Sequence, residues 1–153
     1  MDVEGEFVLP AAPALVWLRL NDPHVLARCI PGCQRMTRVD AERFECEIRI
    51  SYGLLKASFM TRLVLANVRA PDSYTLIASG QGGLAGLGEG VADVRLLPVA
   101  DGTMLRYAAR LSASGRISKL GSHLLGTTTR RLAEKFFKAF AASFHGALEG
   151  VSD

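Results

Sequence analysis

Residues 117–148, ISKLGSHLLGTTTRRLAEKFFKAFAASFHGAL, form the longest helical pattern in the sequence. A stripe of mostly apolar side chains recurs there at three- and four-residue spacing, which places its members on one face of a helix. These residues are Ile117, Leu120, Leu124, Thr128, Leu132, Phe136, Phe140 and Phe144. A helix of this length has to bury such a stripe against another layer of structure, and the preceding sequence must supply that layer.

Residues 33–113 alternate between apolar and polar side chains with a period of two. Phe44, Cys46, Ile48 and Ile50, for example, are separated by charged residues. This alternation is typical of strands with one buried and one wet face. Short breaks rich in glycine, proline and aspartate separate the runs, which favours hairpins and an antiparallel meander of about six strands.

The chain before this region predicts one more strand and two short helices. Residues 4–9 form an extended run. Pro13 then opens a short helix, because a proline in the first helical turn loses no hydrogen bond. Asp22 is a suitable N-cap for a second helix that begins at Pro23 and ends near Cys29.

We therefore expect an α+β fold in which a curved antiparallel sheet of about seven strands surrounds the long C-terminal helix. Two short helices follow the first strand and close one end. The length of 153 residues suits one domain. We assign residues 1–148 to this domain and residues 149–153 to a C-terminal tail.

The composition favours a binding cavity. Hydrophobic residues make up 49% of the chain and charged residues only 22%, which is more apolar material than a core of this size needs. The gap between the sheet and the helix is the natural ligand site. We expect the following residues to line it: Trp17, Phe44, Ile48, Leu55, Phe59, Leu76, Leu84, Leu87, Gly88, Gly90, Leu105, Tyr107, Leu124, Leu125, Phe136 and Phe140.

A glycine cluster occupies residues 80–90. Its first six residues fit the relaxed dinucleotide pattern GxGxxA, but the glycine-rich continuation does not favour the helix that a phosphate site needs. Two interpretations stay open. The segment is a hairpin with flexible flanking strands, or the missing side chains of Gly88 and Gly90 leave room for a ligand, with Leu84 and Leu87 as an apolar lip.

We expect no metal site. The three cysteines, Cys29, Cys33 and Cys46, are an odd and low number, which suits a reducing compartment better than a disulfide scaffold. Structural zinc needs four ligands, commonly in two close pairs, and no second pair accompanies Cys29 and Cys33.

No catalytic residue is predicted either. No serine or cysteine motif indicates a nucleophile, and no carboxylate neighbours His123 to orient it. If the cavity held an enzyme active site, Tyr107 and His123 would be its candidate polar groups.

The last helix region is strongly basic. One acid, Glu134, accompanies the following residues that we assign to a membrane or partner surface: Lys119, Arg130, Arg131, Lys135 and Lys138. A solvated helix face is one explanation. Contact with an anionic partner or with membrane headgroups is the other.

Several localisation and partner classes are disfavoured. The net charge of +3 is mild, and no nucleic-acid-binding motif is present. The acidic N-terminus does not resemble a signal peptide, and no apolar run reaches the ~20 residues that cross a bilayer. We expect a cytoplasmic protein, with a peripheral position on the inner face of the cell membrane left open.

The sequence also resembles a known family. The segments FVLPA (residues 7–11), LNDP (residues 20–23) and CIPGC (residues 29–33) are similar to the opening of the CoxG family, which is named for the CoxG subunit of carbon monoxide dehydrogenase. The glycine-rich segment from Gly80 and the phenylalanine pair at residues 136–137 continue the similarity over nearly the whole chain.

This resemblance implies the START-like, or helix-grip, fold of the SRPBCC superfamily. It also implies an accessory role beside a molybdenum hydroxylase such as carbon monoxide dehydrogenase. Members are implicated in recruiting that enzyme to the membrane and in handling a quinone, its electron acceptor. The ligand expected from the resemblance is therefore menaquinone or ubiquinone, and no covalent cofactor is expected.

Three functions follow as hypotheses. The first is a non-catalytic accessory protein that binds a lipid, with a quinone as the ligand. The second is a small-molecule cyclase or hydrolase, because this fold also hosts such enzymes. The third is a docking module whose cavity is filled by its own side chains.

Overall fold

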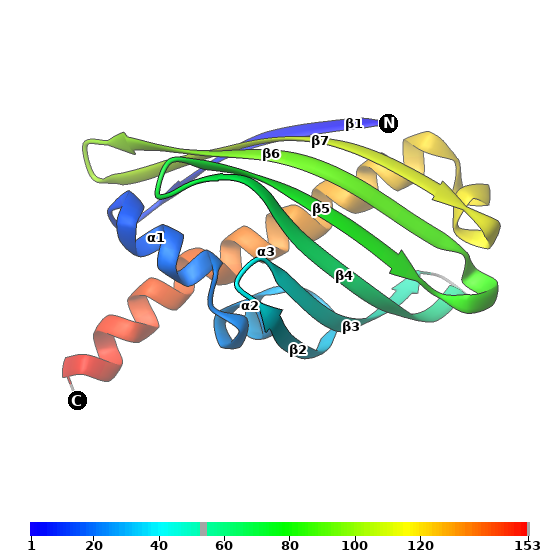
Figure 1. The fold of residues 1–153 in the computed structure, drawn as a ribbon, viewed down its shortest axis with the longest axis horizontal. Helices are drawn as coiled ribbons and strands as arrows, with labels where there is room; N and C mark the ends of the chain where they lie inside the picture. Colours follow the sequence, from blue (N-terminus) through cyan, green and yellow to red (C-terminus); the bar gives the residue numbers. More distant parts are fainter. Residues whose placement is uncertain (53–54, 153) are drawn as a thin grey trace.

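The computed structural model describes residues 1–52 and 55–152, with side chains described for these except 52, 55, 122 and 146–152. Figure 1 shows the order of the elements. They are β1 (Asp2–Leu9), α1 (Pro13–Leu20), α2 (Pro23–Cys29), β2 (Cys33–Asp40), β3 (Arg43–Tyr52), β4 (Leu55–Arg69), β5 (Ser73–Gln81), the 3-10 turn η1 (Gly83–Ala85), β6 (Leu87–Val99), β7 (Gly102–Ser114), the 3-10 turn η2 (Gly115–Leu120) and α3 (Gly121–Ser152).

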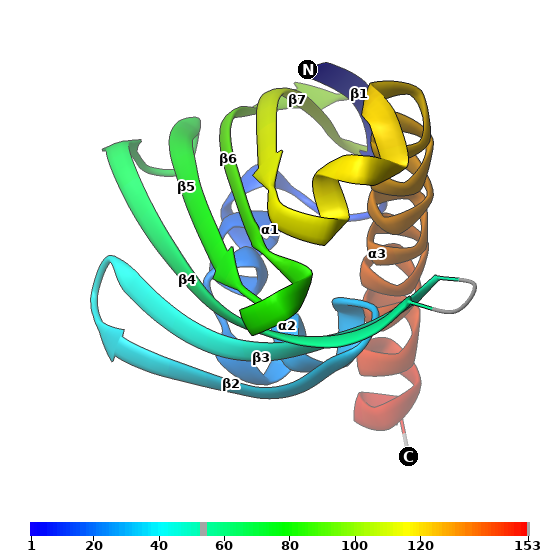
Figure 2. The ribbon, with the colours of Figure 1, turned by 90° about the vertical axis from the view of Figure 1, so that its right-hand side faces the viewer.

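The seven strands form one antiparallel sheet in the order β1-β7-β6-β5-β4-β3-β2. Figure 2 looks along the long axis and shows the sheet curving around a central space, with α3 on the concave side. Helix α3 packs against β1 at one edge and against α2, which in turn covers β2 at the other edge. The predicted fold class is therefore confirmed.

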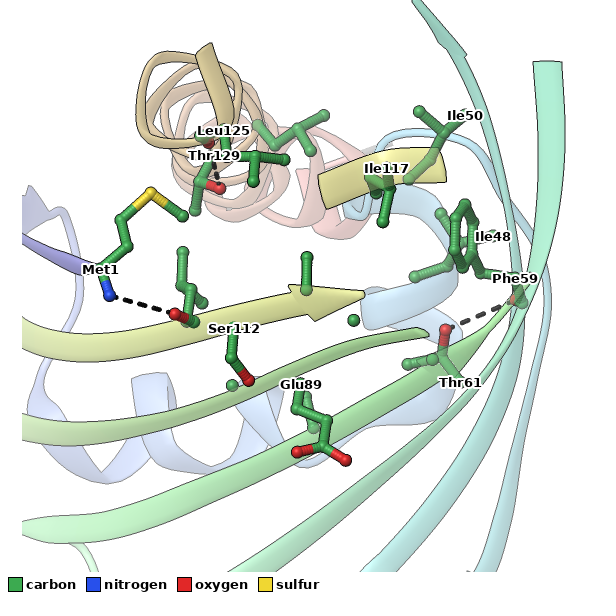
Figure 3. A pocket seen from close by; sticks show the side chains of 17 residues that line it. Met1, Ile48, Ile50, Phe59, Thr61, Glu89, Ser112, Ile117, Leu125 and Thr129 are labelled. Atoms are coloured by element: carbon green, nitrogen blue, oxygen red, sulfur yellow. Dashed lines mark hydrogen bonds between the residues drawn. The ribbon is translucent and has the colours of Figure 1, made fainter. Parts of the chain in front are cut away.

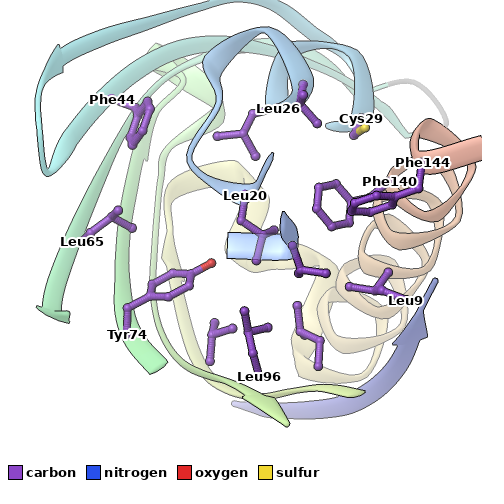
Figure 4. Close-up of a cluster of buried hydrophobic side chains, with 14 residues drawn as sticks. Leu9, Leu20, Leu26, Cys29, Phe44, Leu65, Tyr74, Leu96, Phe140 and Phe144 are labelled. Atoms are coloured by element: carbon purple, nitrogen blue, oxygen red, sulfur yellow. The ribbon is translucent and has the colours of Figure 1, made fainter. Parts of the chain in front are cut away.

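The hydrophobic core fills the end of the sheet that α1 and α2 cover (Figure 4). Phe140 of α3 is 0% exposed, and its ring centroid lies 5.6 Å from that of Phe136 and 5.2 Å from that of Phe144. Trp17 of α1 meets Tyr74 of β5 edge-on at 5.4 Å between centroids. We call this the closed end, because two short helices and three phenylalanines seal it.

The opposite end carries η1 and η2, which touch each other through two glycines. Gly86 and Gly115 have φ values of +111° and +77°, a conformation that side chains disfavour. A Cβ atom on Gly115 would lie only 2.6 Å from the Cα of Gly86. These two positions therefore require glycine, and they hold the two turns together at what we call the open end.

The helix itself departs from the predicted pattern. Residues 115–120 form η2, and α3 begins only at Gly121, whose φ is +81°. Within α3, the face turned towards the sheet includes Leu125 rather than Leu124, because four-residue steps drift around a helix of 3.6 residues per turn. Leu124 is 39% exposed, so its predicted place in the buried stripe is wrong.

Replacement of Phe140 by alanine tests the role of the closed end. We expect Phe140→Ala to lower the free energy of unfolding by about 3–5 kcal/mol, because a fully buried ring leaves a cavity in a core that α1, α2 and the sheet hold rigid. Urea denaturation followed by far-UV circular dichroism measures this. The matched control is Leu124→Ala on the same helix, for which about 0.5 kcal/mol or less is expected. Equal losses for the two variants would contradict the described core.

Candidate ligand-binding cavity

Empty space runs between α3 and the concave face of the sheet, in two adjoining compartments. The outer compartment lies at the open end and has a volume of about 320 Å³. The inner compartment lies towards the closed end and has a volume of about 330 Å³. Thr129 and Leu132 of α3 border both compartments. Volumes of this size are at the lower end of the range for small-molecule sites.

The two compartments follow α3 over several turns. Their helical lining begins at Leu125 and ends at Phe137. At a rise of ~1.5 Å per residue, this stretch is about 18 Å long. The space therefore suits an elongated molecule whose two ends meet different surroundings.

The space exists because inward side chains of the sheet become smaller towards the open end. On β6 the inward series is Leu96, Val94, Ala92, Gly90 and Gly88. The paired positions on β5 follow the same gradient from Tyr74 through Leu76 and Ala78 to Gly80. Since helix and sheet stay apart at one end and touch at the other, this gradient leaves an opening rather than a collapsed core.

Gly88 shows the effect most directly. A Cβ atom added there would meet no atom within 4 Å, and its φ is not in the left-handed region. The backbone therefore does not need glycine at this position, and the missing side chain contributes open volume to the outer compartment. This supports the ligand interpretation of the glycine cluster.

Apolar side chains dominate the outer compartment (Figure 3). Phe59, Ile48 and Ile117 line one side, with Leu125 of α3 opposite. The Thr129 hydroxyl donates to the Leu125 carbonyl at 2.7 Å. The carboxylate of Glu89, although its residue borders the compartment, points away from the space.

The inner compartment is lined by the core side of the sheet and by aromatic residues of α3. Its polar members are Tyr74, Tyr107 and Thr129. Burial raises the pKa of Tyr74 well above its usual range, and it also raises the pKa of Tyr107. Both phenols are therefore neutral at physiological pH. No acidic or basic side chain is among the described residues that line this compartment.

Most predicted cavity residues lie on the cavity wall. The outer compartment has Ile48, Phe59, Gly88, Gly90 and Leu125. The inner compartment has Phe44, Leu76, Leu105, Tyr107 and Phe136. Their part in ligand binding stays a prediction.

Five further predicted residues are not on the wall. Trp17 packs behind Tyr74, and Phe140 is sealed into the core. Leu84 projects from η1 with 80% of its surface exposed, Leu124 faces outwards, and Leu87 is half-buried beside η1. The side chain of Leu55 lies outside the described residues.

Sequence reasoning missed several wall residues. They are small residues on the inward face of the sheet and residues of α3 that lie opposite: Ala78, Gly80, Ala92, Ala113, Thr129, Leu132, Ala133 and Phe137. Tyr74 was missed as well. The sequence signal that could have found them is the decrease in side-chain size at every second position of β5 and β6, two strands that pair as a hairpin.

The two residues considered as candidate catalytic groups, Tyr107 and His123, do not lie together in the cavity. Tyr107 is on the inner wall, whereas His123 is exposed near the start of α3. Among the described residues, no group of three His, Cys, Asp or Glu side chains could hold a metal ion. Cys46 is buried, and this burial raises its pKa to about 12, which keeps the thiol protonated and unreactive.

The predicted basic residues are all exposed. Lys119 lies in η2, and four more follow along α3: Arg130, Arg131, Lys135 and Lys138. The ion pairs in the described part of the chain do not involve them. Their charge is therefore available to a partner. No helix of the described residues is both long enough and apolar enough to span a membrane.

Solved structures share this architecture. A conserved protein from Geobacillus kaustophilus is 24% identical with a TM-score of 0.89, and the match covers 96% of this chain and 97% of that one. A protein from Thermus thermophilus, TTHA0849, is 14% identical with a TM-score of 0.71 over 96% and 99% of the two chains. The Zhui aromatase/cyclase from Streptomyces sp. R1128 is 13% identical with a TM-score of 0.68 over 94% and 92%.

At these identities the likeness shows the fold, which is START-like. A comparison with curated proteins gave no match. The family model for CoxG, a subunit of carbon monoxide dehydrogenase, matches residues 5–144, which include nearly all of the sheet and most of α3. The chain therefore belongs to the CoxG family.

Proposed function

We propose that this protein is a non-catalytic accessory protein of a molybdenum hydroxylase of the carbon monoxide dehydrogenase type, and that it carries a quinone in its cavity. The observation behind this proposal is the elongated apolar space between α3 and the sheet. Carbon monoxide oxidation releases electrons that need an acceptor. A quinone is an apolar, uncharged acceptor, and a protein that shields it from water would help it to reach the enzyme.

The lining favours carriage over catalysis. Acid–base catalysis needs positioned groups that exchange protons near neutral pH. The tyrosines of the inner compartment have raised pKa values, and His123 is outside. The empty volume likewise favours a ligand carrier over a docking module with a filled cavity.

The open end has the features of a membrane contact. Leu84 at the tip of η1 is 80% exposed, and η1 touches η2, which carries the exposed Arg116 and Lys119. An apolar tip beside cations suits insertion among anionic headgroups. A quinone leaving the bilayer would then meet the outer compartment first.

Filling the outer compartment tests the carriage of a quinone. We expect Gly88→Phe to weaken binding of a short-tailed menaquinone at least tenfold, because the new ring would occupy the volume of the isoprenoid tail while the backbone stays unstrained. Equilibrium dialysis measures this. The matched control is Val91→Phe on the same strand, where the side chain is 45% exposed on the outer face. Unchanged binding by Gly88→Phe would place the ligand elsewhere.

Charging the tip of η1 tests the membrane contact. We expect Leu84→Asp to reduce co-sedimentation with vesicles of phosphatidylcholine and phosphatidylglycerol severalfold, because a carboxylate opposes insertion beside anionic headgroups. Leu18→Asp is the control, since Leu18 is 66% exposed on α1 at the other end of the molecule (Figure 1). If both variants lost binding equally, the open end would have no special role.

Charge reversal on α3 tests the partner surface. We expect the triple variant Arg131→Glu, Lys135→Glu and Lys138→Glu to weaken binding to the purified hydroxylase at least tenfold, with less effect at high salt. Biolayer interferometry measures this. Reversal of Arg95 and Arg110, which are exposed on the sheet, is the control. Binding that is insensitive to the triple variant would exclude this face.

A further inference from the structure

The hydroxyl group of Tyr74, in the inner compartment, makes no hydrogen bond among the described residues. Tyr74 begins the inward series of β5 and is 8% exposed. Its ring contacts Trp17 and forms part of the wall of the inner compartment. Figure 4 shows its oxygen directed towards the middle of the space that the sheet encloses. A phenol in an otherwise apolar surrounding ordinarily has a hydrogen-bond partner.

No hydrogen bond of the Tyr74 hydroxyl is present among the described residues, although Thr129 on the same wall has one. In the same part of the chain, no fully enclosed polar side-chain atom lacks a partner. The Tyr74 oxygen is therefore not enclosed by protein atoms. Since Tyr74 lines the inner compartment, the oxygen borders its empty space.

The other polar groups of the compartment are placed differently. The Thr129 hydroxyl donates to the Leu125 carbonyl. The Tyr107 hydroxyl lies over the backbone of Gly5, since a Cβ atom there would be 2.9 Å from it, and the charges of Arg130 and Glu134 reach this phenol. Tyr107 is thus at the β1 edge beside charged groups, whereas Tyr74 faces the apolar interior.

We propose that Tyr74 is the head-group anchor of this cavity: its hydroxyl donates a hydrogen bond to a neutral acceptor, a carbonyl of the quinone type, while the apolar tail of the ligand lies in the outer compartment. This inference rests on the proposed function. A hydrogen-bond donor in an apolar pocket raises the affinity for a ligand that accepts its hydrogen bond, and it lowers the affinity for a ligand that leaves the donor unpaired.

The same surroundings select against carboxylates. No cationic side chain is among the described residues that line the inner compartment. A fatty-acid head group placed there would lose its hydration without an opposite charge, which is far more costly than burying a carbonyl that is hydrogen-bonded. The ligand class is therefore neutral lipids with a hydrogen-bond acceptor at one end.

A pair of probes that differ only in their carbonyl groups tests the anchor. These are 2,3-dimethyl-1,4-naphthoquinone and 2,3-dimethylnaphthalene, and the two methyl groups of the quinone block the ring positions at which a thiol would add. Trp17 is the single tryptophan of the chain and lies 5.4 Å from Tyr74 between ring centroids, so quenching of its fluorescence reports quinone at the anchor. Equilibrium dialysis gives the affinity of each probe.

We expect Tyr74→Phe to weaken the quinone about tenfold and to change the hydrocarbon less than about twofold, in line with the loss of one buried hydrogen bond. Thr75→Val is the control, because it removes a hydroxyl from the same strand at a half-buried position outside the cavity lining, and it should alter neither probe by more than about twofold. Palmitate should not displace the quinone from the wild-type protein.

Equal affinities of Tyr74→Phe and the wild-type protein for the quinone would overturn the anchor and leave the cavity intact. Failure of the wild-type protein to bind either probe would overturn the proposed function as well. Should Tyr74→Phe not fold, the infrared carbonyl stretch of the bound quinone decides with the wild-type protein. A shift below its frequency in hexane supports the hydrogen bond, and an unshifted band contradicts it.

Discussion

Contact between α3 and the concave sheet is the interaction on which the rest of the structure depends. At the closed end, Phe136, Phe140 and Phe144 stack along one face of the helix and meet side chains of both the sheet and the short helices. That burial fixes the helix relative to the strands. Towards the open end the same helix cannot reach the sheet, because the strands there present glycine and alanine. One rigid contact thus both holds the domain together and keeps the cavity open.

The cavity differs from the sealed core in having room for a ligand. Its walls are apolar, its length follows several turns of α3, and the phenol of Tyr74 lies at the inner end. A molecule with an apolar tail and a neutral polar head matches that order of surroundings. The quinone that we propose as the ligand has this order of head and tail, and it would also be the electron acceptor that the proposed partner enzyme needs.

The fold could be predicted from the sequence because each element has a local signature. Pro13 and Asp22 mark the two short helices, and the alternation around Phe44 gives strands with one buried face. The site was only partly predictable. Leu124 was misplaced because the predicted stripe advances in four-residue steps, which drift around a helix of 3.6 residues per turn. Counted back from Phe136, the inward positions are Leu132, Thr129 and Leu125. Tyr74 was overlooked because its proposed role as a hydrogen-bond donor depends on the empty space that its hydroxyl faces. That space arises only when β5, β6 and α3 come together.

Native mass spectrometry of the purified protein, with organic extraction and mass spectrometry of what it releases, tests whether the space between α3 and the sheet is a lipid site. We expect one isoprenoid quinone per chain, either retained from the host cell or taken up when menaquinone is added. A protein that emerges empty and also takes up no added menaquinone would contradict this expectation.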